Sequence, residues 1–416
     1  MNAAGERLQE AIARHRAGDY AAAESGYRAH LQQFPGDPSA LHFLGLLRNH
    51  QGRNSEGIPL MLAALEADPG YVDAWSNLGI AYFEVRDLER AEKCYRKAIE
   101  LAPGFANAWV NLARTLRAKD CLEEALHALG RTLELNPWHR EAALYYGQLL
   151  YGLDRLPQAL EFYRNWLDRS PDEPIAQHML AALGGSGCPS RASDAYVRST
   201  FDDFAESFDR SLQQLQYRAP QLLYEALLRD GVQRDAAPAT GVLSGSADLE
   251  VLDLGCGTGL CGPLLRPLAR HLVGVDLSPK MLSQAAARGV YDQLNCAELT
   301  EWLAACDRTF DLAVAADVLC YFGDLDLAFA RVRSVLAPDG RFCCSLEAAP
   351  EGESGQPFVL RPHGRYQHQL AYLEGSLARS GLRTIRISQS VLRCERKEAV
   401  AGYVVVAGVA LATGSF

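Results

Sequence analysis

The chain has 416 residues, of which 48% are hydrophobic and 22% are charged, and its formal net charge at pH 7 is -10. This composition provides enough apolar side chains for folded cores, which excludes a disordered or fibrous protein. The acidic excess argues against binding nucleic acid through its phosphates, and no apolar run reaches the ~18 residues of a membrane span.

The cysteines and the N-terminus indicate a cellular compartment. The chain has 11 cysteines but no Cys-x-x-Cys pair, which argues against a zinc cluster and a disulfide framework. The first 20 residues are charged throughout and lack the apolar segment of a signal peptide. We therefore expect a cytoplasmic protein without a metal site.

A repeat runs through the first half of the chain. Prolines recur at a spacing of 34 residues, at Pro35, Pro69, Pro103, Pro137 and Pro171. Small residues, tryptophans and leucines recur in the same register, as expected for paired antiparallel helices that end at the proline. The pattern resembles tetratricopeptide repeats, with five units, which implies an all-α superhelix with a concave face.

Two asparagines within the repeats are candidates for binding. Asn77 and Asn111 occupy the same register position on the predicted inner helices. An amide can both donate to and accept from an extended peptide backbone, and similar arrays use asparagines in this way. We expect a protein or peptide partner on the concave face; the alternative is an amide bound to solvent or to its own helix.

A change in composition indicates the domain boundary. The helical pattern continues to Leu183, and a glycine-rich stretch with a proline follows. We predict a repeat domain over residues 1–183, a linker over 184–191 and a second domain over 192–416. The second domain begins with a helical region over 192–228 and a surface loop over 231–247.

Strand and helix patterns alternate after this loop. The expected strands cover residues 250–254, 271–275, 310–315, 341–346, 384–388 and 403–409, and the first expected helix covers 260–268. This alternation predicts an α/β domain with a mostly parallel, doubly wound sheet. The last two strands have no helix between them, so they should pair antiparallel.

A glycine-rich turn follows the first of these strands. Asp253 precedes Gly255, Gly257 and Gly259, and glycines at such a turn let the backbone approach a ligand closely. A nicotinamide-binding turn would place its third glycine one residue later, where this chain has Leu260, so an oxidoreductase is disfavoured. The spacing resembles the first motif of class I S-adenosylmethionine-dependent methyltransferases.

This resemblance implies a Rossmann-like, seven-stranded domain that binds S-adenosylmethionine. The ammonium of its methionine tail suits Asp253, beside the backbone of the turn that contains Cys256. Asp276 ends the second expected strand, where a carboxylate can accept both ribose hydroxyls. The alternative role of Asp276 is to cap a turn.

Further cofactor contacts follow from the same resemblance. Leu277 and Met281 are expected to flank the adenine, and Glu298 and Leu299 to lie at its edge. Glu298 could instead be a solvated loop residue. Residues 201–209 resemble the lid helix of these enzymes, although their phenylalanines also fit an ordinary amphipathic helix.

Candidates for acceptor binding lie after the expected strands over residues 310–315 and 341–346. Asp317 and Tyr321 follow the first of these two strands, at the edge where such sheets bind ligands; Asp317 could contact the cofactor or act in catalysis. The second group, Arg365, Tyr366 and His368, could hold an anionic substrate through the arginine and supply a base through the histidine. These three could also be loop residues without a catalytic role.

The combined order of motifs resembles a family of methyltransferases fused to tetratricopeptide repeats, and the resemblance covers nearly the whole chain. It implies methyl transfer to an acceptor, either a small molecule or a protein, with the repeats recruiting a protein partner. The alternative function is a repeat scaffold whose cofactor-binding domain is not catalytic.

Overall fold

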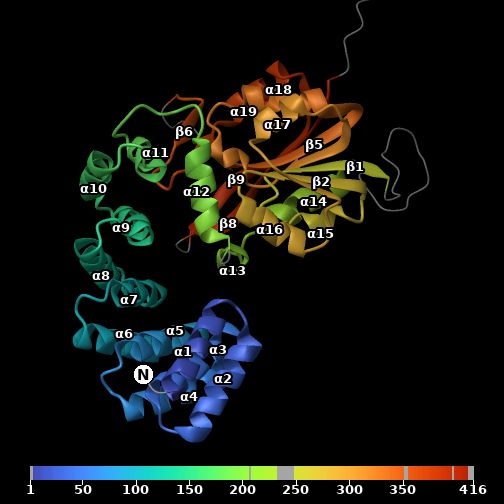
Figure 1. The fold of residues 1–416 in the computed structure, drawn as a ribbon. Helices are drawn as coiled ribbons and strands as arrows, with labels where there is room; N and C mark the ends of the chain where they lie inside the picture. The colour runs from blue at the N-terminus through green and yellow to red at the C-terminus, as the bar shows by residue number, and fades with distance from the viewer. Residues whose placement is uncertain (1–2, 206–207, 232–247, 351–354, 396–397, 411–416) are drawn as a thin grey trace, which may run out of the picture. The chain divides into compact units, whose positions relative to one another are not determined.

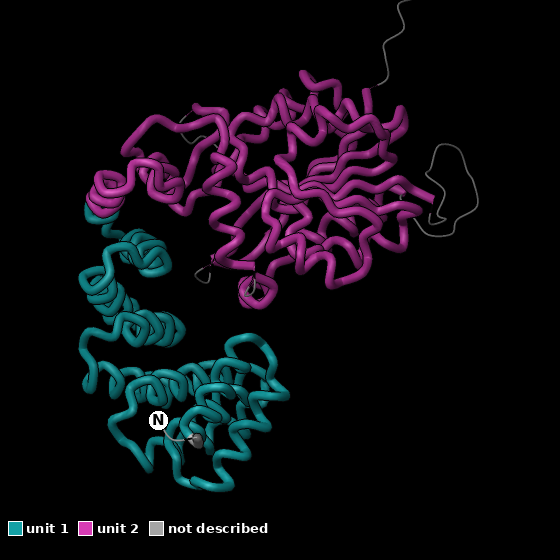
Figure 2. Tube along the Cα trace, in the orientation of Figure 1, with its two compact units in different colours: residues 1–159 teal, residues 160–416 magenta. Residues whose placement is uncertain are grey.

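The computed structural model describes residues 3–205, 208–231, 248–350, 355–395 and 398–410. Figure 2 shows that the chain divides into two compact units, Met1–Ala159 and Leu160–Phe416. Most of the surface loop predicted over 231–247 lies outside the described residues.

The first unit consists of paired helices, which confirms the predicted repeats (Figure 1). Their bounds are α1 Ala3–Arg16, α2 Tyr20–Gln33, α3 Pro38–His50, α4 Asn54–Ala67, α5 Val72–Glu84, α6 Leu88–Leu101, α7 Ala106–Ala118, α8 Leu122–Leu135 and α9 Arg140–Gly152. Helix α10 (Leu156–Arg169) crosses into the second unit, which also contains α11 (Pro174–Ala182).

The repeated residues have the packing roles that their types suggest. Pro69 directly follows the C-cap of α4, where its ring prevents the helix from continuing. Its carbonyl accepts a 2.9 Å hydrogen bond from the indole of Trp75, which links the turn to the next helix. A Cβ atom on Gly79 would lie only 2.6 Å from the ring of Tyr95, so the small residue permits the two helices to approach closely.

The second unit contains a mixed sheet covered by helices on both faces (Figure 1). Its strands are β1 Leu249–Leu254, β2 Ala269–Asp276, β3 Gln293–Cys296, β4 Phe310–Ala315, β5 Leu336–Ala348, β6 Phe358–Leu360, β7 Tyr366–His368, β8 Leu382–Glu395 and β9 Glu398–Val409. Its remaining helices are α12 Asp194–Phe204, α13 Phe208–Gln214, α14 Ala219–Arg229, α15 Gly262–Leu265, α16 Pro279–Ala287, α17 Leu299–Ala305, α18 Asp326–Val335 and α19 Leu370–Arg379.

The strand order confirms the predicted doubly wound α/β fold. Strands β3, β2, β1, β4 and β5 are parallel neighbours in that order. Strand β9 pairs antiparallel with β5 and with β8, as predicted for the last two strands. One core lies beneath α17, α18 and α19, and the other beneath α14 and α15. This arrangement aligns the carboxyl ends of the parallel strands along one edge.

Three details of the prediction were wrong. The described sheet has nine strands rather than seven, because the β6–β7 hairpin extends from the end of β5. Helix α15 covers four residues, Gly262–Leu265, instead of the expected 260–268. Strand β8 is longer than the predicted strand. The prediction was too short because most residues of β8 are not fully buried, so the sequence shows only a weak apolar pattern there.

Within the part of the chain that the structure describes, no helix combines the length and apolarity needed to cross a membrane. The same residues contain no group of three or more potential ligands that could hold a metal ion.

Candidate functional site

The glycine-rich turn after β1 is tightly packed on two sides. Gly255, Gly257 and Gly259 all have positive φ angles, of 63°, 55° and 84°, which glycine adopts at little cost. A Cβ atom on Gly255 would lie 2.4 Å from the side chain of Val318, whereas one on Gly257 would meet only Phe208, at 3.9 Å. The backbone therefore lies against the segment after β4 and leaves space beside Gly257.

Asp253 presents an unsatisfied carboxylate oxygen close to this turn. The residue is 1% exposed, and its Oδ2 accepts a 2.6 Å hydrogen bond from the hydroxyl of Tyr291. Its Oδ1 is buried without a partner in the described structure. Burial raises the pKa of Asp253 to about 7, the Tyr291 hydrogen bond opposes this shift, and the charge of Asp276 adds to it. A buried acceptor without a partner is costly, so Oδ1 marks a position for a donor.

Asp276 lies at the end of β2, beside the same turn. Its Oδ2 accepts a hydrogen bond from the backbone N–H of Gly257 at 2.9 Å, and its Oδ1 accepts one from Ser278 at 2.8 Å. Burial raises its pKa, while these backbone hydrogen bonds lower it. Each oxygen retains capacity for another hydrogen bond, so the carboxylate can accept two hydroxyls.

The segment predicted as a lid, residues 201–209, covers the end of α12 and the start of α13, and residues 206–207 lie outside the described residues. Asp202 on α12 accepts a 2.5 Å hydrogen bond from Ser278, and Asp209 on α13 accepts one from Thr258, also at 2.5 Å. Phe201 packs edge-on against Tyr321, with ring centroids 5.5 Å apart. The two helices therefore contact residues beside Asp276 and beside Asp317.

The predicted adenine contacts are distributed around α16 and α17. Leu277 is half-buried, whereas Met281 on α16 is 1% exposed. Leu299 packs into one of the cores of the sheet. Glu298 caps α17, accepting a hydrogen bond from Glu301 N at 2.8 Å, and also pairs with Arg191 at 3.1 Å. Its carboxylate therefore has protein partners, and the cofactor roles of these residues remain predictions.

Asp317 lies two residues after the carboxyl end of β4 and has a strained conformation. Its φ of 58° lies in the left-handed region, which non-glycine residues seldom adopt. Its N–H donates to Ser345 Oγ at 2.9 Å, and its Oδ2 accepts from Arg393 Nη1 at 2.7 Å. Its Oδ1 is buried without a partner in the described structure. Burial raises the pKa of Asp317, and Arg393 opposes that shift.

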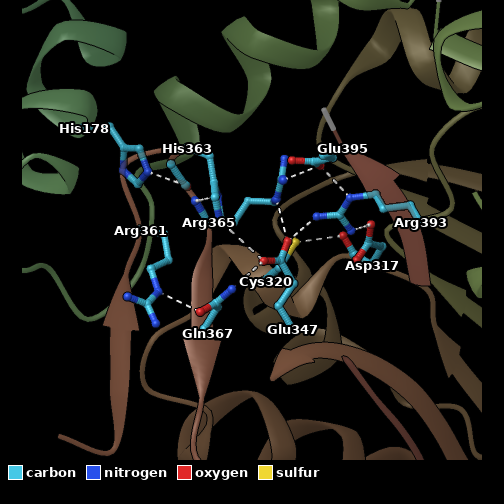
Figure 3. Close-up of polar contacts among 11 residues, drawn as sticks. His178, Asp317, Cys320, Glu347, Arg361, His363, Arg365, Gln367, Arg393 and Glu395 are labelled. Carbon is cyan, nitrogen blue, oxygen red and sulfur yellow. Dashed lines mark hydrogen bonds and ion pairs between the residues drawn. The ribbon is translucent and has the colours of Figure 1, made fainter. Parts of the chain in front are cut away.

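Two arginines and three carboxylates form a buried ion cluster around Asp317 (Figure 3). Arg365 contacts Glu347 at 2.6 Å and Glu395 at 2.5 Å. Arg393 contacts Asp317, Glu395 and Glu347, and Glu347 is completely buried. Arg365 was expected to hold a substrate anion, but both of its contacts are with protein carboxylates, and the ionised cluster has one net negative charge.

The other two residues of the predicted acceptor group are also buried. Tyr366 donates its hydroxyl hydrogen to Pro189 O at 2.9 Å, and its ring is fully buried. His368 Nε2 lies 2.8 Å from the carbonyl oxygen of Phe322, to which it can only donate. Burial lowers the pKa of His368 to about 4. This geometry fits a neutral ring that joins β7 to the segment after β4, rather than a base.

The two asparagines lie in the first unit. Asn77 on α5 and Asn111 on α7 line one groove, which also reaches the start of α9. The structure therefore brings these two candidates together, as the repeat register predicts.

Comparison with known families agrees with both units. Residues 252–344 match a family described as a methyltransferase domain. Residues 8–72, 72–105, 94–127 and 116–183 each match a tetratricopeptide-repeat family. The chain joins tetratricopeptide repeats to a methyltransferase domain.

Similar proteins cover parts of this chain. Human methyltransferase-like protein 27 is 36% identical over 121 residues, which are 29% of this chain and 45% of that protein. A ubiquinone biosynthesis O-methyltransferase of Brucella anthropi is 30% identical over 152 residues, which are 33% of this chain and 61% of that protein. The chain thus spans about half of the length of these relatives.

Some solved structures have a limited similarity to this chain. The magnesium protoporphyrin IX methyltransferase of Synechocystis, solved with bound S-adenosylmethionine, has a TM-score of 0.38 and 19% identity, covering 52% of this chain and 97% of that one. MamA has a TM-score of 0.37 and 20% identity, covering 42% of this chain and 97% of that one.

Several residues of the methyltransferase domain were missed from the sequence. Tyr291 lies in the connection before β3 and has no motif around it. Arg393 and Glu395 are two residues apart on β8, so they share one face of the strand, and Glu347 lies near the end of β5, at the edge that holds Asp317. The signal in the sequence that could have identified these three residues was the presence of charged side chains within strands.

Proposed function

We propose that the chain is an S-adenosylmethionine-dependent methyltransferase whose repeats recruit a protein partner. The observation that carries this proposal is the partnerless, buried Oδ1 of Asp253 beside the glycine-rich turn. An ammonium group would satisfy that oxygen, and Asp276 can accept the two hydroxyls of a ribose. S-adenosylmethionine carries both groups and, when bound, supplies the methyl group.

The methyl acceptor would bind at the carboxyl end of β4. Oδ1 of Asp317 can receive a hydrogen bond, or a proton if the acceptor must lose one. Arg393 holds the other oxygen and so fixes the direction of the carboxylate. The protein would contribute mainly alignment of the acceptor with the methyl group, which is a large part of catalysis for reactions of this type.

The repeats would bind a protein or peptide through the groove that contains Asn77 and Asn111. We propose residues 1–183 as the repeat domain, 184–191 as the linker and 192–416 as the methyltransferase domain, which agrees with repeat matches that end at residue 183. We also propose a cytoplasmic location, which the 11 free cysteines favour.

Isothermal titration calorimetry of the full chain with S-adenosylmethionine tests the cofactor, with NAD as the control ligand. We expect micromolar binding of S-adenosylmethionine alone. Asp276→Ala should weaken binding by more than about tenfold, because it removes charge-assisted hydrogen bonds. The matched control is Asp326→Asn, since Asp326 pairs with Arg379 on the surface. Unchanged binding by Asp276→Ala would make the assignment wrong.

Turnover distinguishes this proposal from the alternative scaffold. We expect S-adenosylhomocysteine to accumulate when proteins captured by the repeats are added to the chain with S-adenosylmethionine. Tight cofactor binding without methyl transfer to any acceptor would favour a non-catalytic domain.

A further inference from the structure

The first helices of three consecutive repeats form a polar groove in the first unit. The groove has a volume of about 370 Å³ and is lined by residues of α5, α7 and α9. None of the described residues that line it is a lysine or an arginine, whereas two are acidic, Asp73 and Glu141. This lining is unsuited to an anionic ligand.

The amide of Asn77 has its nitrogen already engaged. Asn77 Nδ2 lies 2.9 Å from Nε2 of His42, whose Nδ1 lies 3.0 Å from the hydroxyl of Tyr71. Burial lowers the pKa of His42 to about 4, so the ring is neutral and Nε2 can accept the amide hydrogen. The carbonyl oxygen of Asn77 has no partner among the described residues, so Asn77 offers the groove a hydrogen-bond acceptor.

The amide of Asn111 is arranged in the opposite sense. Its Oδ1 accepts a long, 3.5 Å hydrogen bond from Arg114 Nη1. The nitrogen of the amide is then available to donate into the groove. Asn77 can therefore receive an N–H of an extended chain, and Asn111 can donate to one of its carbonyls.

The two acids add charge to this arrangement. Asp73 lies in the first turn of α5, is exposed, and forms no ion pair within the described ranges. Glu141 lies in the first turn of α9 and forms an ion pair with Arg114 at 4.0 Å, in which both side chains are exposed. Neither carboxylate is fully neutralised by the protein, so both can attract a cation at the groove.

We propose that this groove binds an extended, basic segment of a partner protein, with a lysine or arginine at Asp73 and another at Glu141. The helices α5 and α9 are two repeats apart, which corresponds to roughly 20 Å at about 10 Å for each pair of neighbouring helices. Extended chain covers this distance in about six residues, which sets the spacing of the two cations. The inference depends on the proposed recruitment role, but binding requires no methyl transfer.

The test is fluorescence anisotropy of the full chain with labelled, end-blocked peptides of about seven residues. Each peptide has alanine and serine in the middle and lysine, glutamate or glutamine at both ends. We expect the lysine peptide to bind at least about tenfold more tightly than the glutamate peptide, and to weaken as salt is raised. Asp73→Asn and Glu141→Gln should each reduce its affinity about two- to fivefold, as for exposed ion pairs.

The matched control is Glu66→Gln, because Glu66 is an exposed acid on α4 that does not line the groove. This variant should bind the lysine peptide as the parent chain does. The proposal is overturned if the glutamate peptide binds as well as the lysine peptide, if no peptide binds, or if Asp73→Asn and Glu141→Gln together leave the affinity unchanged. The peptide assay contains no cofactor. A negative result in this assay therefore does not affect the conclusion from the titration with S-adenosylmethionine.

Discussion

Cofactor binding should depend on pH through Asp253. Burial raises the pKa of this carboxyl from its usual 3.8 to about 7. At 1.36 kcal/mol for each unit, about 4 kcal/mol opposes its ionisation in the folded protein. A bound ammonium group favours the ionised form, so the affinity for S-adenosylmethionine should rise as pH rises through about 7.

The size of this effect follows from the fraction of ionised carboxylate. With a pKa of about 7, about 3% of Asp253 is ionised at pH 5.5 and roughly three quarters at pH 7.5. The association constant from calorimetry should therefore rise about 25-fold over this range. Asp253→Asn should bind more weakly and lose most of the slope, while any slope that persists reports Asp276, whose pKa burial also raises.

A flat profile for the parent chain would contradict this reasoning, as would an Asp253→Asn variant with the full slope of the parent. Either result would mean that Asp253 is ionised without the ligand or does not contact it. Comparing the heat signal in two buffers of different ionisation enthalpy adds an independent measure, since proton release should accompany binding below pH 7.

Three further predictions concern the same domain. Tyr291→Phe removes the hydrogen bond that lowers the pKa of Asp253, so S-adenosylmethionine should bind several-fold more weakly at pH 7 in calorimetry and recover at higher pH; equal affinity at pH 7 would refute this. Arg393→Leu leaves Asp317 without its ion-pair partner and removes one of the two cations beside Glu347, so it should lower the free energy of unfolding by about 3–5 kcal/mol in urea denaturation, more than Arg393→Lys does. Gly255→Ala should lower the melting temperature more than Gly257→Ala, because both have positive φ but a Cβ atom at Gly255 would clash with Val318 at 2.4 Å, whereas one at Gly257 would make an ordinary contact with Phe208 at 3.9 Å; the reverse order would contradict this packing.

Ionisation of Asp253 also affects stability without ligand. Its raised pKa means that the folded state binds a proton more tightly than the unfolded state does, so the stability present below about pH 4 is lost as pH rises through about 7. This loss amounts to about 4 kcal/mol, and Asp253→Asn should not show it. Thermal melting from pH 5 to 8, following the transition that S-adenosylmethionine shifts, measures the difference between the two proteins. Parallel melting profiles would show that Asp253 is not the responsible group.

The repeats and the main elements around the glycine-rich turn could be predicted from the sequence. The 34-residue period is visible because each unit packs against its neighbours in the same way, so the same residue types recur, as Trp75 does beside Pro69. The turn after β1 and the acid after β2 were also readable, because strand, turn and helix are adjacent in the chain and depend on local backbone geometry.

The contacts between side chains far apart in the sequence could not be predicted, because they depend on how the strands pair. Arg393 reaches Asp317 because β9 and β8 fold back beside β5, a pairing that brings together residues 76 positions apart. The same packing buries His368 and gives Arg365 two carboxylate partners, so their types suggested chemistry that their surroundings do not support. Charge and residue type are properties of the sequence, whereas burial and ion pairing depend on the order of the strands, which local patterns do not specify.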